Sequence, residues 1–254
     1  MGRIGAANRP APGRRRATRG GRVFLVGDAA HLNPPWGGHG FNTGIGDAVN
    51  IGWKLAAVLA GWGGERLLAS YEAERRPIAE RTIREARLNM STLAPDLAHP
   101  SLDATGQVGE HARRGAADAI RAAKDSEFHS LGFVLNYQYD DSPVIADDGA
   151  SDESGARPGA RLPHLWLPDG TSLYDRLGPG LSLLRLRDDS DPAPLIEAAT
   201  TRGVPLDIVE VRGEALEERY GAPLILVRPD QHVAWRGTAD PRTAGAIVDR
   251  ACGV

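Results

Sequence analysis

The sequence predicts an α/β protein built in two parts. In the first part, a short apolar run at 23–26 (Val-Phe-Leu-Val) precedes a glycine-rich loop and then a helical pattern of apolar residues. An apolar run bounded by turn residues is typical of a fully buried parallel strand. In the second part, strand-like and helix-like segments follow in the order βαβαββα, which predicts a mixed sheet with helices outside.

Composition restricts the classes of protein that fit this chain. It has 254 residues with 30 Lys+Arg against 33 Asp+Glu, so the formal net charge is −3, which argues against a nucleic-acid-binding protein. No run approaches the roughly 18 to 20 apolar residues that a bilayer crossing requires, so we expect a cytoplasmic protein without a membrane partner. Cys252 is the only cysteine, so redox chemistry must come from a cofactor.

Shifts in composition predict four segments. Residues 1–20 are rich in arginine and lack acidic residues, which predicts a flexible tail; the absence of aromatic residues there disfavours nucleic-acid binding. Residues 21–139 hold the apolar run and the long helices. Residues 140–156 are rich in Asp, Ser and Gly and are expected to be a linker, and residues 157–254 form the second domain.

The pattern after the loop predicts a helix that begins near Phe41 or Asn42 and ends at the glycines of 61–64. We expect its apolar face to be buried, and its polar stripe is most simply a solvated or locally paired face. The apolar face holds Ile45, Ala48, Val49, Gly52, Trp53, Ala56, Leu59 and Ala60, and the polar stripe holds Asp47, Asn50 and Lys54.

Two more helices and a strand are predicted before the linker. The first helix carries charges spaced for i,i+4 pairing, such as Glu72 with Arg76, and Pro77 is expected to kink or divide it. Residues 107–130 are weakly helical and mostly polar. Residues 132–139 alternate well enough for a strand.

The second domain resembles the thioredoxin-like fold in its order of elements. The predicted strands are 181–187, 206–211, 223–227 and 232–236, and the predicted helices are 193–202, 214–220 and 242–251. Pro223 occupies the position where that fold usually carries a cis-proline. The Cys-x-x-Cys pair is absent, so the resemblance implies the scaffold without its redox activity.

The segment around the first loop suits a large planar ligand. Asp28 follows the apolar run and can accept hydrogen bonds from ribose- or ribityl-type hydroxyls. The glycines of 37–40 allow the backbone to approach a ring closely. The helix that begins near Phe41 directs free N–H groups and its dipole toward negative charge.

Residues 21–60 resemble the second FAD-binding motif of the class A flavoprotein aromatic hydroxylases, the p-hydroxybenzoate and phenol hydroxylase family. The resemblance is carried by Gly-Asp-Ala-Ala-His at 27–31, a Pro-Pro and glycine-rich loop at 34–40, and Trp-Lys-Leu-Ala at 53–56. It implies an FAD-dependent monooxygenase that uses NAD(P)H and O2 on a small aromatic or polyketide-type substrate. The residues that it assigns to FAD are Gly27, Asp28 (ribityl chain), Pro35 (beside the isoalloxazine), Gly37, Gly38, Gly40, Phe41 and Asn42 (the last three at the N1–C2=O edge).

The sequence also departs from that family. The family opens with a βαβ unit bearing Gly-x-Gly-x-x-Gly, which seats the FAD pyrophosphate, and no segment here supplies it. The chain is therefore expected to be the C-terminal half of a hydroxylase, completed by a missing N-terminal half or a homodimer partner. The alternative from another class is a non-catalytic interaction or dimerisation module built on the thioredoxin-like domain.

Single residues near the motif allow other interpretations. Asp28 can instead cap the loop through the backbone N–H groups of Ala30 or His31. A metal site on Asp28, His31 and His39 is a weaker hypothesis, because Asp-x-x-His in a loop is a weak signal; a hydrogen bond that fixes the loop is the simpler role for His31. The arginines at 75 and 76 are expected to form ion pairs on their helix; the alternative is that they bind the phosphate of NADPH.

Overall fold

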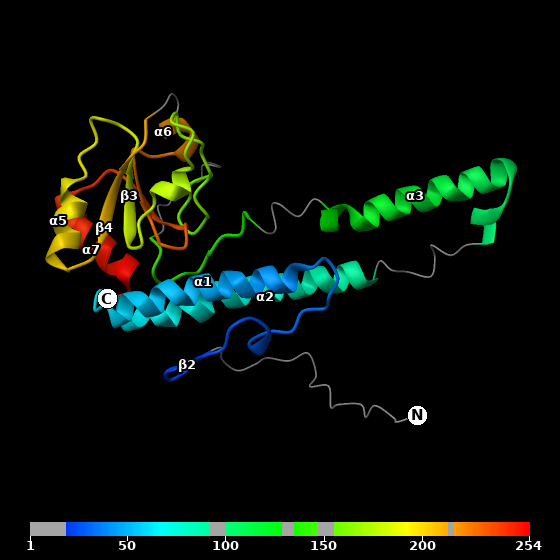
Figure 1. Cartoon of the computed structure of the whole chain (residues 1–254), viewed down its shortest axis with the longest axis horizontal. Coiled ribbons are helices and arrows are strands. Elements are labelled where there is room, and N and C mark those ends of the chain that lie inside the picture. Colours follow the sequence, from blue (N-terminus) through cyan, green and yellow to red (C-terminus); the bar gives the residue numbers. More distant parts are fainter. Residues whose placement is uncertain (1–18, 92–99, 129–134, 147–154, 213–215) are drawn as a thin grey trace.

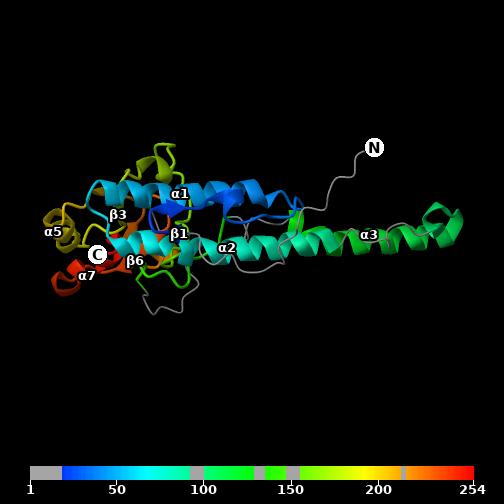
Figure 2. The same cartoon turned by 90° about the horizontal axis from the view of Figure 1, so that it is seen from below.

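The computed structural model describes residues 19–91, 100–128, 135–146, 155–212 and 216–254, so most of the predicted tail lies outside the described residues. Two long helices, α1 (His39–Leu59) and α2 (Glu65–Ser91), lie side by side against a sheet domain (Figures 1 and 2). The helix α3 (Gly106–Phe128) extends away from that domain and confirms the helix predicted at 107–130 over the described residues. The predicted α/β class is confirmed.

The apolar run at 23–26 does not form the predicted buried parallel strand. β1 (Arg19–Gly20) and β2 (Val23–Phe24) pair as a two-residue antiparallel hairpin, and Val23 is 64% exposed. Among the described residues, β1 is the sole strand paired with β2. A buried parallel strand requires neighbours on both sides and cover on both faces, and the described residues do not provide them here.

The helix α1 begins and ends close to the predicted residues. Gly38, its N-cap, has a φ of +66°, and Gly61, just past its end at Leu59, has a φ of +86°. Both angles lie in the left-handed region, which glycine adopts at little cost. Glycines at these positions therefore define where the helix starts and stops.

The buried face of α1 is the reverse of the predicted one. The side chains of the predicted polar stripe are at most 1% exposed: Asp47, Asn50 and Lys54. Members of the predicted apolar face are 47 to 84% exposed: Ile45, Val49 and Leu59. Trp53 is buried as predicted. Periodicity identifies the two faces of a helix, and the partners of the polar stripe decide which face turns inward.

The helix α2 passes through Pro77 without interruption, so the predicted division is wrong. Proline removes the N–H that the carbonyl of Ala73 would accept, and both residues lie on the exposed side, where water can satisfy that carbonyl. The predicted pair of Glu72 with Arg76 forms at 3.2 Å, and Arg76 also bonds Glu80 at 3.1 Å. This side of α2 is the solvated one.

The sheet domain has the predicted βαβαββα order. Its strands are β3 (Leu181–Arg185), β4 (Leu206–Glu210), β5 (Leu224–Val227) and β6 (Val233–Gly237), and its helices are α5 (Ala193–Thr201), α6 (Leu216–Tyr220) and α7 (Pro241–Cys252). The strand order is β4-β3-β5-β6, with β3 and β4 parallel and the other pairs antiparallel. The peptide bond before Pro223 is trans, so the expected cis-proline is wrong.

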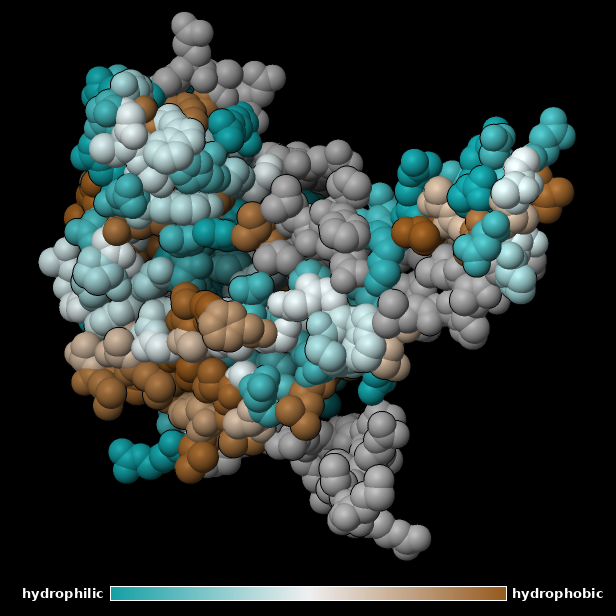
Figure 3. All heavy atoms as spheres, turned by 45° about the vertical axis from the view of Figure 1, so that its right-hand side comes forward, coloured by the Kyte–Doolittle hydropathy of each residue, from teal (hydrophilic) through white to brown (hydrophobic). Residues whose placement is uncertain are grey.

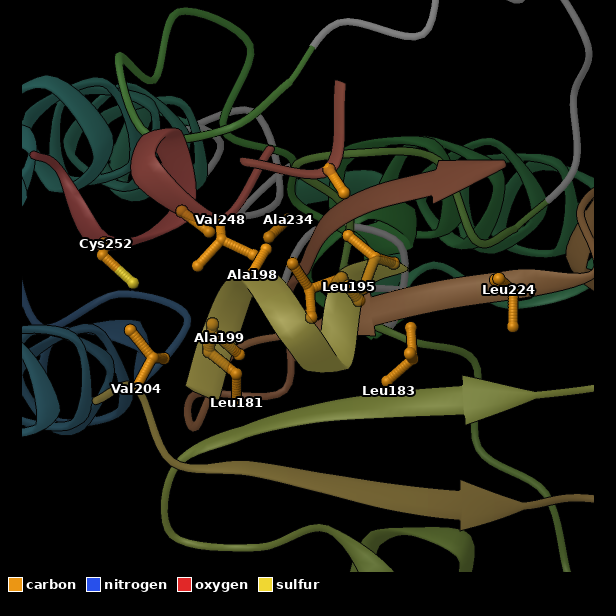
Figure 4. Packing of buried hydrophobic residues seen from close by; sticks show 13 residues of the cluster. Leu181, Leu183, Leu195, Ala198, Ala199, Val204, Leu224, Ala234, Val248 and Cys252 are labelled. Carbon is orange, nitrogen blue, oxygen red and sulfur yellow. The ribbon is translucent and has the colours of Figure 1, made fainter. Parts of the chain in front are cut away.

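Alternate residues of β3 pack into two cores. Leu181 and Leu183 contact α5 and α7 on one face of the sheet, as Figure 4 shows, whereas Leu184 packs with α6 on the other face. Three short 3-10 helices complete the described elements, at Gly27–Ala29, Pro100–Asp103 and Leu173–Arg176. None of the helices in the described ranges is long and apolar enough to cross a membrane.

The segment between the helices and the sheet is packed against both. Of the predicted strand at 132–139, residues 132–134 lie outside the described residues, and the remainder forms a single bridge between Gln138 and Ala160, so the strand prediction is wrong there. Val144 is 1% exposed and packs with Trp53. The first residues of the predicted linker thus join the two parts.

The lone cysteine is placed where it is chemically inert. Cys252 is fully buried at the end of α7, and burial raises the pKa of its thiol to about 12. Because the thiolate is the reactive form, we expect insulin-disulfide reduction no faster than a protein-free blank at pH 7. A faster rate that Cys252→Ala abolishes would contradict this prediction.

Candidate functional site

The loop that carries Asp28 is closed by its own backbone. The carbonyl of Gly27 accepts the N–H groups of Ala30 at 2.8 Å and His31 at 2.9 Å. These are the two N–H groups that the alternative capping role of Asp28 would use, and in this structure the carbonyl of Gly27 accepts both of them. Asp28 is exposed and makes no hydrogen bond or ion pair with the described residues. Its carboxylate is therefore available to a ligand.

Asp47 of α1 holds this loop. One of its carboxylate oxygens accepts Nε2 of His31 at 2.7 Å and the N–H of Gly27 at 3.1 Å, and the other accepts Nε of Arg75 at 2.8 Å. Burial alone would raise the pKa of Asp47, but the hydrogen bond from His31 and the charge of Arg75 lower it. The predicted loop-fixing hydrogen bond of His31 is confirmed.

The other residues assigned to FAD lie beside this loop, in the turn before α1 and in its first turn. Gly37 and Gly38 have positive φ angles of 81° and 66°, and Phe41 is 79% exposed. Pro35, Gly40 and Asn42 are exposed or half-buried. A Cβ on Gly44 would lie 3.3 Å from Cα of Gly27, so α1 and the loop are in close contact. The loop that carries Asp28 therefore packs against α1 at Gly44, just after the helix residues assigned to FAD.

A buried network of charged side chains was missed by the sequence interpretation. Glu74 of α2 is its centre, because its carboxylate accepts five hydrogen bonds. The donors are Asn50, Lys54, Ser142 and, twice, Arg228. Arg228 contributes Nη1 at 2.7 Å and Nη2 at 2.8 Å. These contacts join α1, α2 and the sheet domain.

Electrostatics in the network follow from burial and pairing. Burial would raise the pKa of Glu74, but Arg228 and Lys54 hold it well below its usual range. Desolvation lowers the pKa of Lys54 to about 8, against the attraction of Glu74. Arg228 also pairs with Asp230 at 2.6 Å and lies over the ring of Trp53 at 5.1 Å. Each charge in the network is compensated by a neighbour.

A cavity of about 340 Å³ opens next to this network. It lies between the first half of α1, α2 and the turn that connects β5 to β6. Its lining includes Asn42, Arg75, Tyr139 and His232, and the ring of His232 stacks on that of Tyr139 at 4.4 Å. The predicted cofactor residue Asn42, which is exposed, also lines this cavity.

The network makes the fold sensitive to acid. In the folded chain, the partners of Asp47, Glu74 and Asp230 lower the pKa of each carboxyl group. Between these lowered pKa values and about pH 4, the unfolded chain therefore binds more protons than the folded chain. The stability that they contribute is complete above that range and falls by about 1.4 kcal/mol per pH unit for each group as pH drops through it.

Urea unfolding measured from pH 6 to pH 2.5 checks this prediction. We expect the free energy of unfolding to fall steeply below pH 4, and less steeply in Asp47→Asn, which has one titrating group fewer. A free energy of unfolding that does not change across this range would contradict the assignment.

Known proteins share both parts of this structure. Residues 11–86 match the family described as FAD binding domain, and residues 155–253 match the family described as aromatic-ring hydroxylase, C-terminal. The FAD-dependent monooxygenase apdD of Emericella nidulans is 35% identical, over 91% of this chain and 41% of its own length. The phenol 2-monooxygenase of Pseudomonas sp. is 34% identical, over 88% of this chain and 44% of its own length.

Solved structures give the same result. The rebeccamycin biosynthetic enzyme RebC with reduced flavin superposes with a TM-score of 0.85 at 40% identity, over 94% of this chain and 46% of that one. Aklavinone-11 hydroxylase in its ternary complex with FAD and aklavinone superposes with a TM-score of 0.71 at 30% identity, over 94% of this chain and 45% of that one.

The fold matches the C-terminal portion of flavoprotein hydroxylases such as RebC. Over the length that it spans, the chain belongs to the class A FAD-dependent aromatic hydroxylase family. It spans less than half the length of the relatives it matches.

Proposed function

We propose that this chain forms the part of an FAD-dependent aromatic-ring monooxygenase that holds the ribityl chain and the N1–C2=O edge of the flavin. The observation that supports this proposal best is the exposed carboxylate of Asp28, without a partner among the described residues, on a loop that packs against α1. NAD(P)H is the reductant and a small aromatic or polyketide-type molecule the substrate.

Each part of the loop surface has a task in this proposal. Asp28 accepts hydrogen bonds from flavin hydroxyls, and Gly37 and Gly38 keep side chains away from the ring. Backbone N–H groups at Gly40, Phe41 and Asn42, with the helix dipole behind them, stabilise negative charge at the flavin edge. Bound FAD supplies the redox and oxygen chemistry, and the chain supplies orientation and electrostatics.

The seat of the FAD pyrophosphate comes from a segment that these 254 residues do not contain. The relatives carry more than half of their length outside the matched region. We assign the exposed apolar side of α1 as the surface on which that segment docks, because Ile45, Val49 and Leu59 are 47 to 84% exposed there, and Ile45 and Val49 also line the cavity. Figure 3 shows apolar surface gathered over this part of the molecule. An exposed apolar patch of this kind marks an interaction site.

Reconstitution tests the proposal. The chain is co-expressed with the N-terminal half of a related hydroxylase, which carries Gly-x-Gly-x-x-Gly, and NAD(P)H oxidation is followed with a panel of phenols and polyketide aromatics. We expect a complex whose NAD(P)H oxidation is stimulated by a panel member and whose product gains one oxygen by mass spectrometry.

The control variant Leu59→Asp places a charge on the docking face at a residue that does not line the cavity beside the buried network. It should abolish co-purification of the two halves while leaving the melting temperature of the chain alone within about 2 °C, since the site is exposed. A homodimer through the same face with no flavin and no association with the N-terminal half would favour the non-catalytic dimerisation module instead.

A further inference from the structure

The buried network runs without a break from the sheet domain to the loop of Asp28. Its members are at most 7% exposed: Asp47, Asn50, Lys54, Glu74, Arg75, Tyr139, Arg228 and Asp230. They include three cations and three carboxylates, so the charges balance. Such a network is stable when every member is satisfied and costly when one is lost.

The sheet-domain end of the network is Arg228, which directly follows β5. Its guanidinium forms one fork with Glu74 of α2, at 2.7 and 2.8 Å, and a second fork with Asp230, at 3.0 and 2.6 Å. The same group lies over the ring of Tyr139 at 5.3 Å. The fork with Glu74 fixes the position of α2 relative to the sheet, and the fork with Asp230 orients Arg228, since bidentate pairs restrict both distance and direction.

The loop end is reached through two further steps. The hydroxyl of Tyr139 accepts hydrogen bonds from Asn50 and from Arg75, both at 3.3 Å. Arg75 then donates to Asp47, which accepts the N–H of Gly27. Tyr139 is therefore the side chain at which the Glu74 half and the Asp47 half of the network meet.

We propose that Arg228 is a positioning residue for the loop 27–31, so that the sheet domain determines the conformation of the surface assigned to FAD. The proposal rests on the proposed function only for the identity of the ligand. The sheet domain then has a role in FAD binding although it does not carry the residues assigned to FAD. Arg228 fixes Glu74, and Asn50, Tyr139 and Arg75 connect Glu74 to Asp47.

Amide hydrogen exchange in the full chain, without flavin, tests this inference. Arg228→Lys keeps the charge but loses the forks, and Tyr139→Phe removes only the hydroxyl that joins the two halves. In both variants we expect exchange at Gly27 and His31 to accelerate by about ten- to a hundred-fold, as loss of hydrogen bonds to charged groups implies. Exchange at Leu183, in the core of the sheet, should stay slow.

The matched control is Arg202→Lys, which changes an arginine of the same domain that pairs with Asp249 on α7, outside the network. It should leave exchange at Gly27 and His31 unchanged. Unaltered exchange at these two amides in Tyr139→Phe, with Leu183 still protected, would overturn the inference even if Arg228→Lys failed to fold.

A second readout separates this inference from the proposed function. In the complex with the N-terminal half, Tyr139→Phe should weaken FAD binding by about ten-fold, whereas Arg202→Lys should leave FAD binding unchanged. If no FAD binds to any complex, the proposed function fails and the exchange result still decides the positioning role. If FAD binds equally well to the complexes of the unchanged chain and of Tyr139→Phe, and amide exchange is unaltered, only the positioning role fails.

Discussion

Replacing Glu74 with glutamine should lower the free energy of unfolding by about 3 to 5 kcal/mol at neutral pH. The carboxylate is 1% exposed and compensates the charges of Lys54 and Arg228, both of which would remain buried. Removing one member of a buried ion pair leaves an uncompensated charge, which costs more than the pair contributed. Urea denaturation monitored by circular dichroism measures the loss.

The matched control is Glu72→Gln, two residues away on the half-exposed side of α2. It removes a surface pair with Arg76, so we expect a loss below about 1 kcal/mol. Equal losses in the two variants would contradict the account of the network.

A double variant sharpens this test. Lys54→Met in the Glu74→Gln background removes a cation as well as the carboxylate, so the remaining charges balance again. We expect the double variant to be more stable than Glu74→Gln alone, with a coupling energy of about 0.5 to 3 kcal/mol. Additive losses would show that the two side chains do not interact.

Asp28→Ala should weaken FAD binding by roughly ten-fold to a few hundred-fold in the complex with the N-terminal half. The carboxylate would lose charge-assisted hydrogen bonds to flavin hydroxyls worth on the order of 1.5 to 3 kcal/mol each. Asp28→Asn keeps one acceptor and should cost less. Because the side chain is exposed and has no partner among the described residues, the melting temperature of the apo-protein should change little.

Titration of flavin fluorescence and thermal unfolding of both Asp28 variants distinguish the roles. Unchanged FAD affinity together with a lowered melting temperature would remove Asp28 from the cofactor site and return it to a structural one.

Local sequence patterns predicted the element order well. The periodicity of α1 and the order of strands and helices in the sheet domain depend on residues that are near one another in the sequence. Where the sequence misled, the deciding contact was distant. Pro77 is tolerated because the affected carbonyl faces water, and the run at 23–26 lacks the neighbours that a buried strand needs.

The polar stripe of α1 shows why part of the site was missed. Asp47, Asn50 and Lys54 recur at helical spacing, which by itself favours a solvated face. Their burial depends on Glu74, 20 residues from Lys54, and on Arg228, 154 residues from Glu74. One signal in the sequence could have indicated this burial. The polar stripe of α1 has matching charged residues elsewhere in the chain, at Glu74-Arg75 and at Arg228-Pro229-Asp230. Residues 157–254, the predicted second domain, contain Arg228 but not Glu74, so Arg228 would lose this partner in a fragment limited to that domain.

The flavin content of the purified protein tests the central claim most directly. The absorbance ratio at 280 and 450 nm is measured for the chain alone and for its complex with an N-terminal half that carries Gly-x-Gly-x-x-Gly. We predict little or no FAD on the chain alone, because the pyrophosphate seat is outside these residues, and about one FAD per complex. Stoichiometric FAD on the chain alone, or a stable complex without flavin, would contradict the account.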